Sequence, residues 1–445
     1  MKASVKLRIL PDDMQVSTIM KTCGCTRVMF NTCLDTWTGN YQAWVDGGKQ
    51  EGQFDSSLPT LRQLKEQHPW IAEADSIAVT SAQMDFKKAL DSWSKSRKKL
   101  RKGEKVGFPK HKKKGKCKYS YRTCNQNGSI RFNDDFTQIK LPKLGWVDVV
   151  VHRPLPNGTI GRVYVSMNKA EEFYVSIVFD VEDPAPVAKK VDHTDNPKVV
   201  GLDMSLSRFC VSSDESDDAI AKYVRNYRKE EEHLKKLQRV LSRKVKHTEV
   251  EIHGRKVKVE TRNHRKARLK LARAHLKVSR RRREFCIKMA RYFANKYDLI
   301  CIEDLNMRAM SQCLRLGKSV MDVGWGQFTR WLDYECQKFG AALIKADKWF
   351  ASSKTCNHCG SVNKDLSLSD REWVCPVCGC VIDRDRNAAM NLMGYAKERI
   401  NPVGTSGLDD RGVLGLARET VSDTMPEKGE TSSKTESKEA AKSSA

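Results

Sequence analysis

Four cysteines in the last quarter of the sequence are spaced as metal ligands. Cys356 and Cys359 form one C-x-x-C pair, and Cys375 and Cys378 form a second pair after fifteen intervening residues. A two-residue gap lets one tight turn present two thiolates to the same ion, and two such pairs complete the tetrahedral shell of structural zinc. The spacing predicts a closed Zn²⁺ knuckle, and a redox-active cysteine pair is the alternative.

The chain has 15 cysteines, and those outside the two pairs are scattered. Some, such as Cys301, lie in apolar strings where a thiol behaves as a small buried hydrophobic group. The odd total and the scatter indicate a reducing compartment rather than a disulfide framework. Gly360 and Gly379 directly follow the two pairs, where a tight turn favours a residue that tolerates positive φ.

Three acidic residues form the second candidate site. Asp203 and Glu303 each end an apolar segment, and Asp385 lies at a predicted helix start seven residues after Cys378. Carboxylates that converge can hold two divalent ions about 4 Å apart, which stabilise the attacking and leaving oxygens of phosphodiester hydrolysis. The structural alternatives are a strand-ending turn for Asp203, an ion pair for Glu303 and a helix cap for Asp385, with Asp383 competing for either role.

The acids must be positioned by an α/β domain that begins near Val199. The apolar segments 199–204 and 299–303 predict buried strands, and a second strand is expected over 208–212. Thin leucine stripes on charged faces predict a helical hairpin over 217–296.

The turn of this hairpin is expected within Lys244–Lys266, at Gly254. Four consecutive arginines, Arg280 to Arg283, occur in its second helix, as a solvated face or as contacts to a phosphate backbone. A short final helix is expected over 383–396.

Strand and helix patterns alternate in the rest of the chain. Residues 1–12 predict one strand, and the helical spacing of apolar residues in 13–100 predicts helices. Short strand patterns over 119–182 predict a small antiparallel barrel or sandwich, which the first strand could join. Prolines in 183–197 indicate a linker, and residues 401–445, without aromatic residues, are expected to be disordered.

A strongly cationic segment, Lys95–Lys118, contains several glycines and is predicted to be a loop. It is followed by Tyr119 and Tyr121, and basic residues beside aromatic ones suit phosphate contact with base stacking. A solvated loop is the alternative.

The overall charge points to a polyanionic partner. The 445 residues include 81 lysines and arginines against 55 aspartates and glutamates, a formal net charge of +26. Such an excess is typical of nucleic-acid binding, with solubility alone as the alternative. No apolar run approaches the ~18 residues of a membrane span, and the first residues lack the apolar segment of a secretory signal. Membrane, secreted and fully disordered classes are therefore not expected.

The sequence resembles the TnpB family of transposon-encoded RNA-guided nucleases, which are related to type V CRISPR effectors. The matching strings occur in the same order as in that family. The resemblance covers about residues 1–396. Its strings near the acids and cysteines are VGLDMSL around Asp203, ICIEDLN around Glu303, SSKTCNHCG at 352–360, WVCPVCG at 373–379 and DRDRNAAMNL at 383–392. Earlier strings are KLRILPD at 6–12, GFPKHK at 107–112 and IKLPKLGWV at 139–147.

The resemblance implies a multi-domain α+β protein. An RNase H-like (RuvC) α/β nuclease domain with an inserted zinc knuckle would be joined to a β-barrel wedge domain and a helical recognition domain. The implied boundaries are 1–12 for the first wedge strand, 13–106 for the recognition domain, 107–195 for the wedge barrel, 196–351 for the RuvC domain, 352–382 for the knuckle, 383–400 for the final RuvC helix and 401–445 for the tail.

The family's catalytic acids map onto Asp203, Glu303 and Asp385, which the resemblance implies hold two catalytic Mg²⁺ ions. In the D-x-N-A-A motif the acid two residues before the asparagine is the metal ligand, which places it at Asp385, with Asp383 as the second choice. The four paired cysteines would hold the structural Zn²⁺.

The resemblance also implies the partners. The family binds a guide RNA from the transposon end, pairs it with double-stranded target DNA beside a short flanking motif, and cuts the DNA with Mg²⁺. We therefore expect an intracellular protein of the cytoplasm or nucleoid, a monomer with its RNA, with no signal peptide and no membrane partner. Lys95–Lys118 and Arg280 to Arg283 are the candidate contacts to guide and heteroduplex.

Two other functions fit the sequence less well. One is an RNA-guided DNA-binding protein that does not cut, which the loss of one acid would signal. The other is a transposase that joins DNA ends without a guide.

Overall fold

The computed structural model describes residues 2–48, 54–98, 105–182, 190, 196–205, 208–218, 226–252, 255–306, 317, 322–367 and 370–400. They divide into two compact units, one within Met1–Pro184 and the other within Ala185–Arg418. No helix in these ranges is long and apolar enough to cross a bilayer. Most of the predicted linker and the whole predicted disordered tail, 401–445, lie outside the described residues.

A seven-stranded antiparallel sheet organises the first unit, with the strand order β2-β6-β7-β1-β5-β4-β3. Strand β1 (Lys2–Leu10) lies in its middle and pairs with β5 (Gly145–Val150) and β7 (Phe173–Asp180). The expectation that the first strand joins the later ones is confirmed. The remaining strands are β2 (Tyr119–Cys124), β3 (Arg131–Phe132), β4 (Gln138–Leu141) and β6 (Thr159–Met167).

Helices fill the long insertion between β1 and β2, as predicted. Helix α1 starts with a capping box in which Asp12 and Gln15 satisfy each other's backbone N–H groups. The Gln15 amide also donates to the carbonyls of Leu144 and Trp146, which fixes the helix to the sheet. The helices are α1 (Asp13–Asp46), α2 (Leu61–Gln67), the 3₁₀ turn η1 (Pro69–Glu73) and α3 (Ser76–Arg97).

A four-stranded sheet organises the second unit, in the order β13-β12-β8-β9. Strand β12 (Leu299–Glu303) runs parallel to both β8 (Val199–Asp203) and β13 (Ala342–Ala346), and β9 (Val211–Ser212) is antiparallel to β8. Strand β9 is shorter than the predicted 208–212. Because β8 and β12 are parallel neighbours, their carboxyl ends lie at one edge of the sheet.

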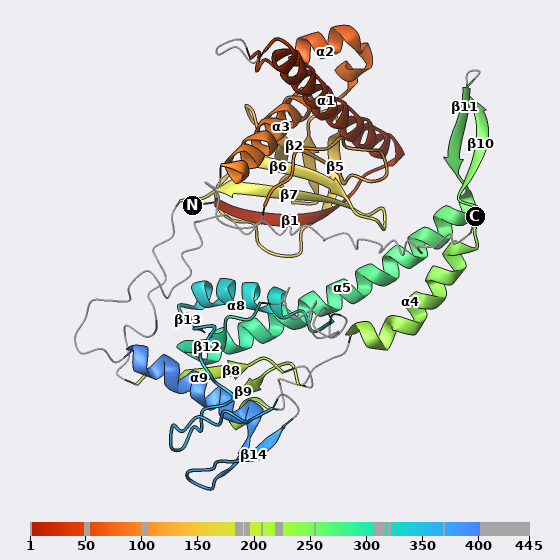
Figure 1. Cartoon of the computed structure of the whole chain (residues 1–445). Helices are drawn as coiled ribbons and strands as arrows, with labels where there is room; N and C mark the ends of the chain where they lie inside the picture. Colours follow the sequence, from red (N-terminus) through yellow and green to blue (C-terminus); the bar gives the residue numbers. More distant parts are fainter. Residues whose placement is uncertain are drawn as a thin grey trace, which may run out of the picture. The chain divides into compact units, whose positions relative to one another are not determined.

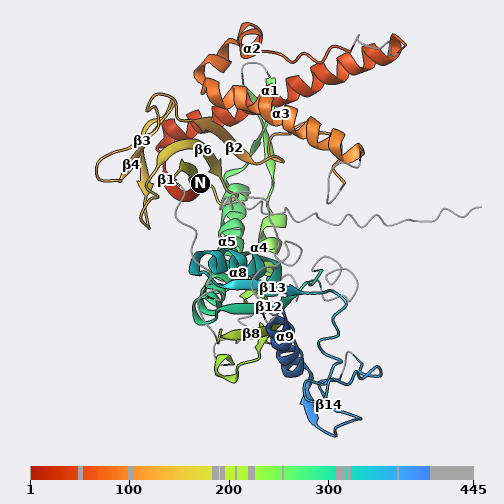
Figure 2. The ribbon, with the colours of Figure 1, turned by 90° about the vertical axis from the view of Figure 1, so that its left-hand side faces the viewer.

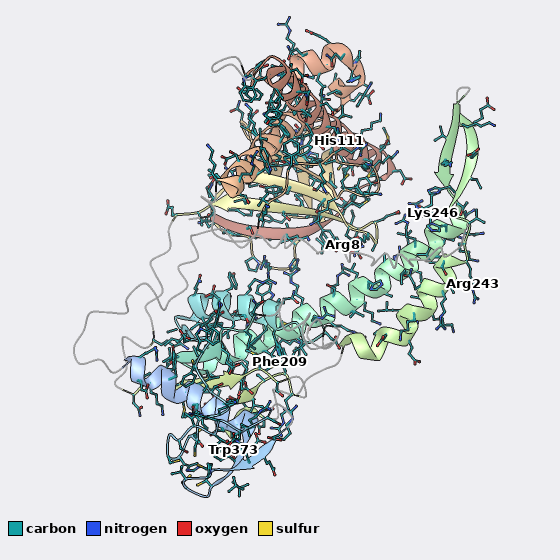
Figure 3. All side chains as sticks on the ribbon, viewed as in Figure 1. Arg8, His111, Phe209, Arg243, Lys246 and Trp373 are labelled. Carbon is teal, nitrogen blue, oxygen red and sulfur yellow. The ribbon has the colours of Figure 1, made fainter. Side chains whose placement is uncertain are left out.

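Helices cover both faces of this sheet (Figures 1 and 2). Helices α5 (Arg262–Lys296) and α8 (Trp325–Phe339) share one apolar core with β8 and β12. Helix α9 (Arg384–Ile400) packs on the other face, against Leu299 and Cys301. Figure 3 labels Phe209, which is fully buried in the first of these cores.

The approach of α9 to the sheet depends on Gly201. A Cβ atom on this residue would lie 2.0 Å from the Ala389 carbonyl oxygen and 2.6 Å from the Met393 nitrogen. Both are backbone atoms of α9, which cannot turn away as a side chain could. The glycine therefore lets the helix that carries Asp385 lie directly on the strand that carries Asp203.

The predicted turn of the helical hairpin needs a correction. Helix α4 (Asn226–Ser242) and α5 are joined by an antiparallel β-hairpin, β10 (His247–Ile252) and β11 (Arg255–Glu260), instead of a simple turn at Gly254, which lies outside the described residues. The cause is a period-two alternation of β-branched residues with charged ones, which favours strands. Figure 3 labels Arg243 and Lys246, just before the hairpin.

Gly201→Ala should destabilise the second unit by about 3 kcal/mol, because its methyl group meets backbone on a helix that is already packed. Gly394→Ala is the matched control within α9, since nothing lies within 4 Å of its added Cβ, and it should stabilise by about 0.5 kcal/mol. Urea unfolding of both variants measures the difference. Equal stability of the two would contradict the close packing.

Candidate metal centres

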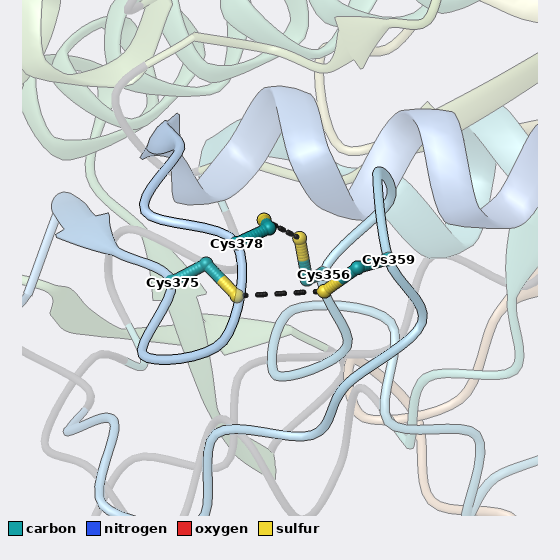
Figure 4. A group of neighbouring side chains, drawn as sticks. All are labelled: Cys356, Cys359, Cys375 and Cys378. Atoms are coloured by element: carbon teal, nitrogen blue, oxygen red, sulfur yellow. Dashed lines mark hydrogen bonds between the residues drawn. The ribbon is translucent and has the colours of Figure 1, made fainter.

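The four paired cysteines meet in one cluster (Figure 4). Their sulfur atoms all lie within 4.8 Å of one another, with 3.7 Å between Cys356 and Cys378 and 3.6 Å between Cys359 and Cys375. Zinc–sulfur bonds of about 2.3 Å in a tetrahedron place the sulfurs about 3.8 Å apart. The cluster is therefore compatible with a closed zinc site.

Two similar turns build this cluster. Gly360 and Gly379 have φ values of +74° and +72°, so the expectation of positive φ after each pair is confirmed. Hydrogen bonds from the Cys378 backbone N–H and the Ser361 hydroxyl lower the pKa of the Cys375 thiol, which favours the metal-binding thiolate. The strands β14 (Glu372–Val374) and β15 (Val381–Asp383) close the knuckle over the buried Trp373, which Figure 3 labels.

Three cysteines outside the cluster have thiols that burial keeps protonated. Cys286, Cys301 and Cys336 are buried, and burial raises the pKa of each thiol to about 12. The prediction that cysteines in apolar strings pack as small hydrophobic groups is confirmed for these residues.

The three predicted acids come together at the carboxyl edge of the second sheet. Asp203 ends β8, Glu303 ends the parallel neighbour β12, and Asp385 lies in the first turn of α9. Burial, together with the negative charges of Glu303 and Asp385, raises the pKa of Asp203 well above its usual value. Asp203 is only 9% exposed. A buried carboxylate with two acidic neighbours favours binding of a cation.

Asp383 and Asp385 have different roles at the start of α9. The Asp383 carboxylate accepts a hydrogen bond of 2.8 Å from the backbone N–H of Arg386, which makes it the helix cap. Asp385 is 15% exposed and contributes to the raised pKa of Asp203. The cap alternative therefore falls to Asp383, and Asp385 is the acid that faces the cluster.

A serine hydroxyl donates to Glu303, and another donates to Asp385. Ser205 donates to Asp385 at 3.1 Å, and Ser352 donates a short hydrogen bond to Glu303. Both serines are at most 5% exposed. These contacts fix the orientation of carboxylates that otherwise repel one another.

Two asparagines on α9 bind residues 352–357, the segment that begins the knuckle. The Asn387 and Asn391 amides both donate to the Thr355 carbonyl at 2.7 Å, and Asn391 also donates to the Ser352 carbonyl at 2.7 Å. The Asn387 oxygen accepts the Asn357 backbone N–H at 2.9 Å. One clamp therefore holds the cysteine loop, the serine that contacts Glu303 and the helix that carries Asp385.

Arginines surround Asp385 and anchor its helix. The Arg371 and Arg384 guanidinium groups lie 3.5 and 3.8 Å from the Asp385 carboxylate. Arg386 donates to the Ser212 carbonyl on β9 and pairs with Asp218 at 2.7 Å. Among the described residues, the four cysteines are the group whose ligand atoms all lie within 4.8 Å, so the acids are spaced more widely than the thiols.

The two basic segments, Arg280 to Arg283 and Lys95–Lys118, differ in whether their charged groups contact other parts of the protein. Arg281 pairs with Glu230 at 2.9 Å, Arg282 lies 3.6 Å from Asp322, and Arg283 stacks over the Trp331 ring. These arginines have partners within the protein.

In the described part of Lys95–Lys118, the exposed lysines and arginine are Lys95, Arg97, Lys98, Lys105, Lys110, Lys113, Lys114, Lys116 and Lys118. Lys112 instead lies over the Phe30 ring at 3.8 Å. The loop is held to α1 because the Asn31 side chain pairs with the backbone of Lys112.

Sequence reasoning missed the serines and asparagines of the clamp. Ser352 and Asn387 stand inside strings that were noted only for their cysteines and acids. The available signal was the placement of Asn387 and Asn391 one helical turn apart, on the face of α9 that follows Asp385.

Asn387→Asp should loosen this clamp, because a carboxylate cannot donate to the Thr355 carbonyl and would repel it. We expect a loss of about 2 kcal/mol in unfolding free energy and faster amide hydrogen exchange over 352–357. Asn363→Asp is the matched control in the same knuckle, since Asn363 is used as an acceptor of the Asp365 N–H. Equal exchange in both variants would show that the clamp does not hold the loop.

Three family models match separate parts of the chain. A family model described as "Helix-turn-helix domain" matches residues 1–44, one described as "Probable transposase" matches 176–314, and one described as "Cas12f1-like, TNB domain" matches 325–392. The first description differs from the structure, in which residues 2–44 form strand β1 and one long helix, α1. The third match spans the cysteine cluster and the start of α9.

Curated relatives match nearly the whole chain. A protein of Streptomyces pristinaespiralis named "Putative RNA-guided DNA endonuclease" is 29% identical over 395 residues, covering 88% of this chain and 89% of that protein. The Escherichia coli K12 protein of the same name, InsQ, is 25% identical over 411 residues, covering 87% of this chain and 90% of that protein.

Solved structures with similar chains have low scores. One titled as a Cas12f1–sgRNA–target DNA complex has a TM-score of 0.29 at 11% identity, covering 88% of this chain and 99% of that chain. One titled as the mini-RNA-guided endonuclease CRISPR-Cas_phi3 has a TM-score of 0.40 at 11% identity, covering 91% and 94%. The sequence matches, which extend in order from the first strand to the helix of Asp385, support a protein of the TnpB family.

Proposed function

We propose that this protein is an RNA-guided DNA endonuclease that cuts by a Mg²⁺-dependent, RuvC-type mechanism. The observation that carries the proposal is the convergence of Asp203, Glu303 and Asp385 at one sheet edge, in a chain whose relatives are named for this activity. The names of the relatives support guidance by RNA and cleavage of DNA. The net charge of +26 supports a large polyanionic partner.

The three carboxylates fit a pair of Mg²⁺ ions, which prefer oxygen ligands and would supply stabilisation of the attacking and leaving oxygens. Asp203 interacts electrostatically with both Glu303 and Asp385, so it would hold the ions together with these two acids. Ser352 and Ser205 hold Glu303 and Asp385 in place through their hydroxyls. The buried strands below the acids give them a rigid base.

The domain roles follow from the same family. The first unit would supply a wedge domain, built on the seven-stranded sheet, and a helical recognition domain within 13–106. Its exposed lysines near 110–118 are candidate contacts to the backbone of a guide RNA taken from the transposon end. The second unit would supply the nuclease domain, with the knuckle as a Zn²⁺-stabilised insertion. A monomer bound to RNA and double-stranded target DNA is the proposed working complex.

Asp385→Asn should reduce target cleavage about a thousand-fold, because it removes a metal ligand, and leave RNA binding nearly unchanged. Asp203→Ala and Glu303→Gln should behave in the same way. Asp383→Asn is the matched control two residues away, since asparagine caps a helix as well as aspartate does. Single-turnover cleavage of a matched target compares the four variants, and full cleavage by Asp385→Asn would overturn the assignment.

Cys375→Ser should release zinc and lower the melting temperature, because a three-thiolate site binds the ion less tightly and loses folding free energy. Cys380→Ser is the matched control, as Cys380 lies beside the quartet without belonging to it. Metal analysis of the purified proteins and thermal unfolding measure both effects. Stoichiometric zinc and an unchanged melting temperature in Cys375→Ser would contradict a four-thiolate site.

A further inference from the structure

One tryptophan beside the acids stands almost entirely in solvent. The chain has nine tryptophans, all within the described residues, and Trp349 is 91% exposed. The next most exposed, Trp70, is 48% exposed. An indole ring carries a large apolar surface, so leaving it in water forgoes the burial that the other tryptophans obtain. Such a ring at a functional edge is available to a partner.

The chain on both sides of Trp349 contacts Glu303. Ala346 is the register partner of Glu303 between β13 and β12, and the Ser352 hydroxyl donates to the Glu303 carboxylate. Trp349 is three residues from each of these contacts, so its backbone lies within about 11 Å of either. The exposed ring is therefore carried by the loop that borders Glu303.

The loop that presents Trp349 is held by its own hydrogen bonds. The Trp349 backbone N–H donates to the Asp347 carboxylate at 2.8 Å, and the Asp347 N–H donates to the Tyr395 hydroxyl at 3.1 Å. The next residue, Phe350, turns inward and packs on the Tyr395 ring with centroids 4.8 Å apart. The loop thus buries one aromatic ring and exposes its neighbour, without using Trp349 for its own packing.

A cation accompanies the exposed ring. Lys348 is 65% exposed and lies 3.8 Å from Asp304, the residue after Glu303, and Lys345 lies at the same distance from Asp304. Two lysines around one aspartate leave a net positive charge, and Lys348 directly precedes Trp349 in the chain. That combination suits a nucleotide, whose base stacks on the ring while its phosphate approaches the ammonium group.

We propose that Trp349 is a stacking platform for an unpaired base of the DNA strand that approaches Asp203, Glu303 and Asp385. Bases within a duplex stack on one another and offer no free face, so the ligand is single-stranded DNA. This inference rests on the proposed function, because the bound strand is taken to be the one that the three acids would cut. Trp349 is a binding residue here and touches no reacting atom.

The test measures binding separately from cutting. A short single-stranded DNA oligonucleotide with one 2-aminopurine is titrated into the full chain carrying Asp203→Asn, so that the probe stays intact. Adding Trp349→Ala should weaken binding roughly 5- to 100-fold and relieve quenching of the probe, while Trp349→Phe should stay within about 3-fold. Trp70→Ala, in the first unit, is the control and should bind as the parent does.

Affinity unchanged in Trp349→Ala would overturn the inference. Unchanged affinity with a lowered melting temperature would assign Trp349 to a protein contact instead, which also overturns it. Cleavage by the unmutated chain is measured in parallel. If Trp349→Ala binds DNA more weakly but the unmutated chain never cuts, the stacking role stands and the nuclease proposal is refuted. If Trp349→Ala binds normally and the unmutated chain cuts, the nuclease proposal stands and the stacking role is refuted.

Discussion

The candidate active site depends on how closely α9 lies on β8. Gly201 has no side chain that would hold them apart, and the helix can then bring Asp385 to the strand end that carries Asp203. Parallel pairing of β8 with β12 adds Glu303 at the same edge. Strand pairing alone would bring two acids together, and the third requires a helix at backbone contact with the sheet.

Three acids in one place are costly for the protein by themselves. Burial and mutual repulsion raise the pKa of Asp203, and such a cluster persists only where other interactions hold it. Here the clamp of Asn387 and Asn391 holds the start of the knuckle, and Ser352 at that start holds Glu303. The cysteine knuckle thus stabilises more than its own loop, because Ser352 at its start also positions the Glu303 carboxylate.

Much of this organisation could be predicted from the sequence, for physical reasons. Two C-x-x-C pairs leave few geometries open, and acids at the ends of apolar strands must meet if the strands are parallel neighbours. The β-hairpin between α4 and α5 was missed because thin leucine stripes dominated the surrounding pattern, although His247–Ile252 and Arg255–Glu260 alternate in a strand-like way. The partners of Arg281 and Arg282 could not be predicted, since Glu230 and Asp322 are distant in sequence and meet them only in the tertiary fold. Asp383 and Asp385 were separable only once the helix start was fixed by a hydrogen bond.

The central claim is that the acid cluster cuts DNA under the direction of RNA. The most direct measurement is cleavage of a plasmid library by the full chain co-expressed with its flanking transposon-end RNA, with a matched target beside randomised bases. The account predicts cutting that requires both the RNA match and Mg²⁺, confined to plasmids with one short flanking sequence. RNA and target that are bound but never cut, at any Mg²⁺ concentration, would contradict it.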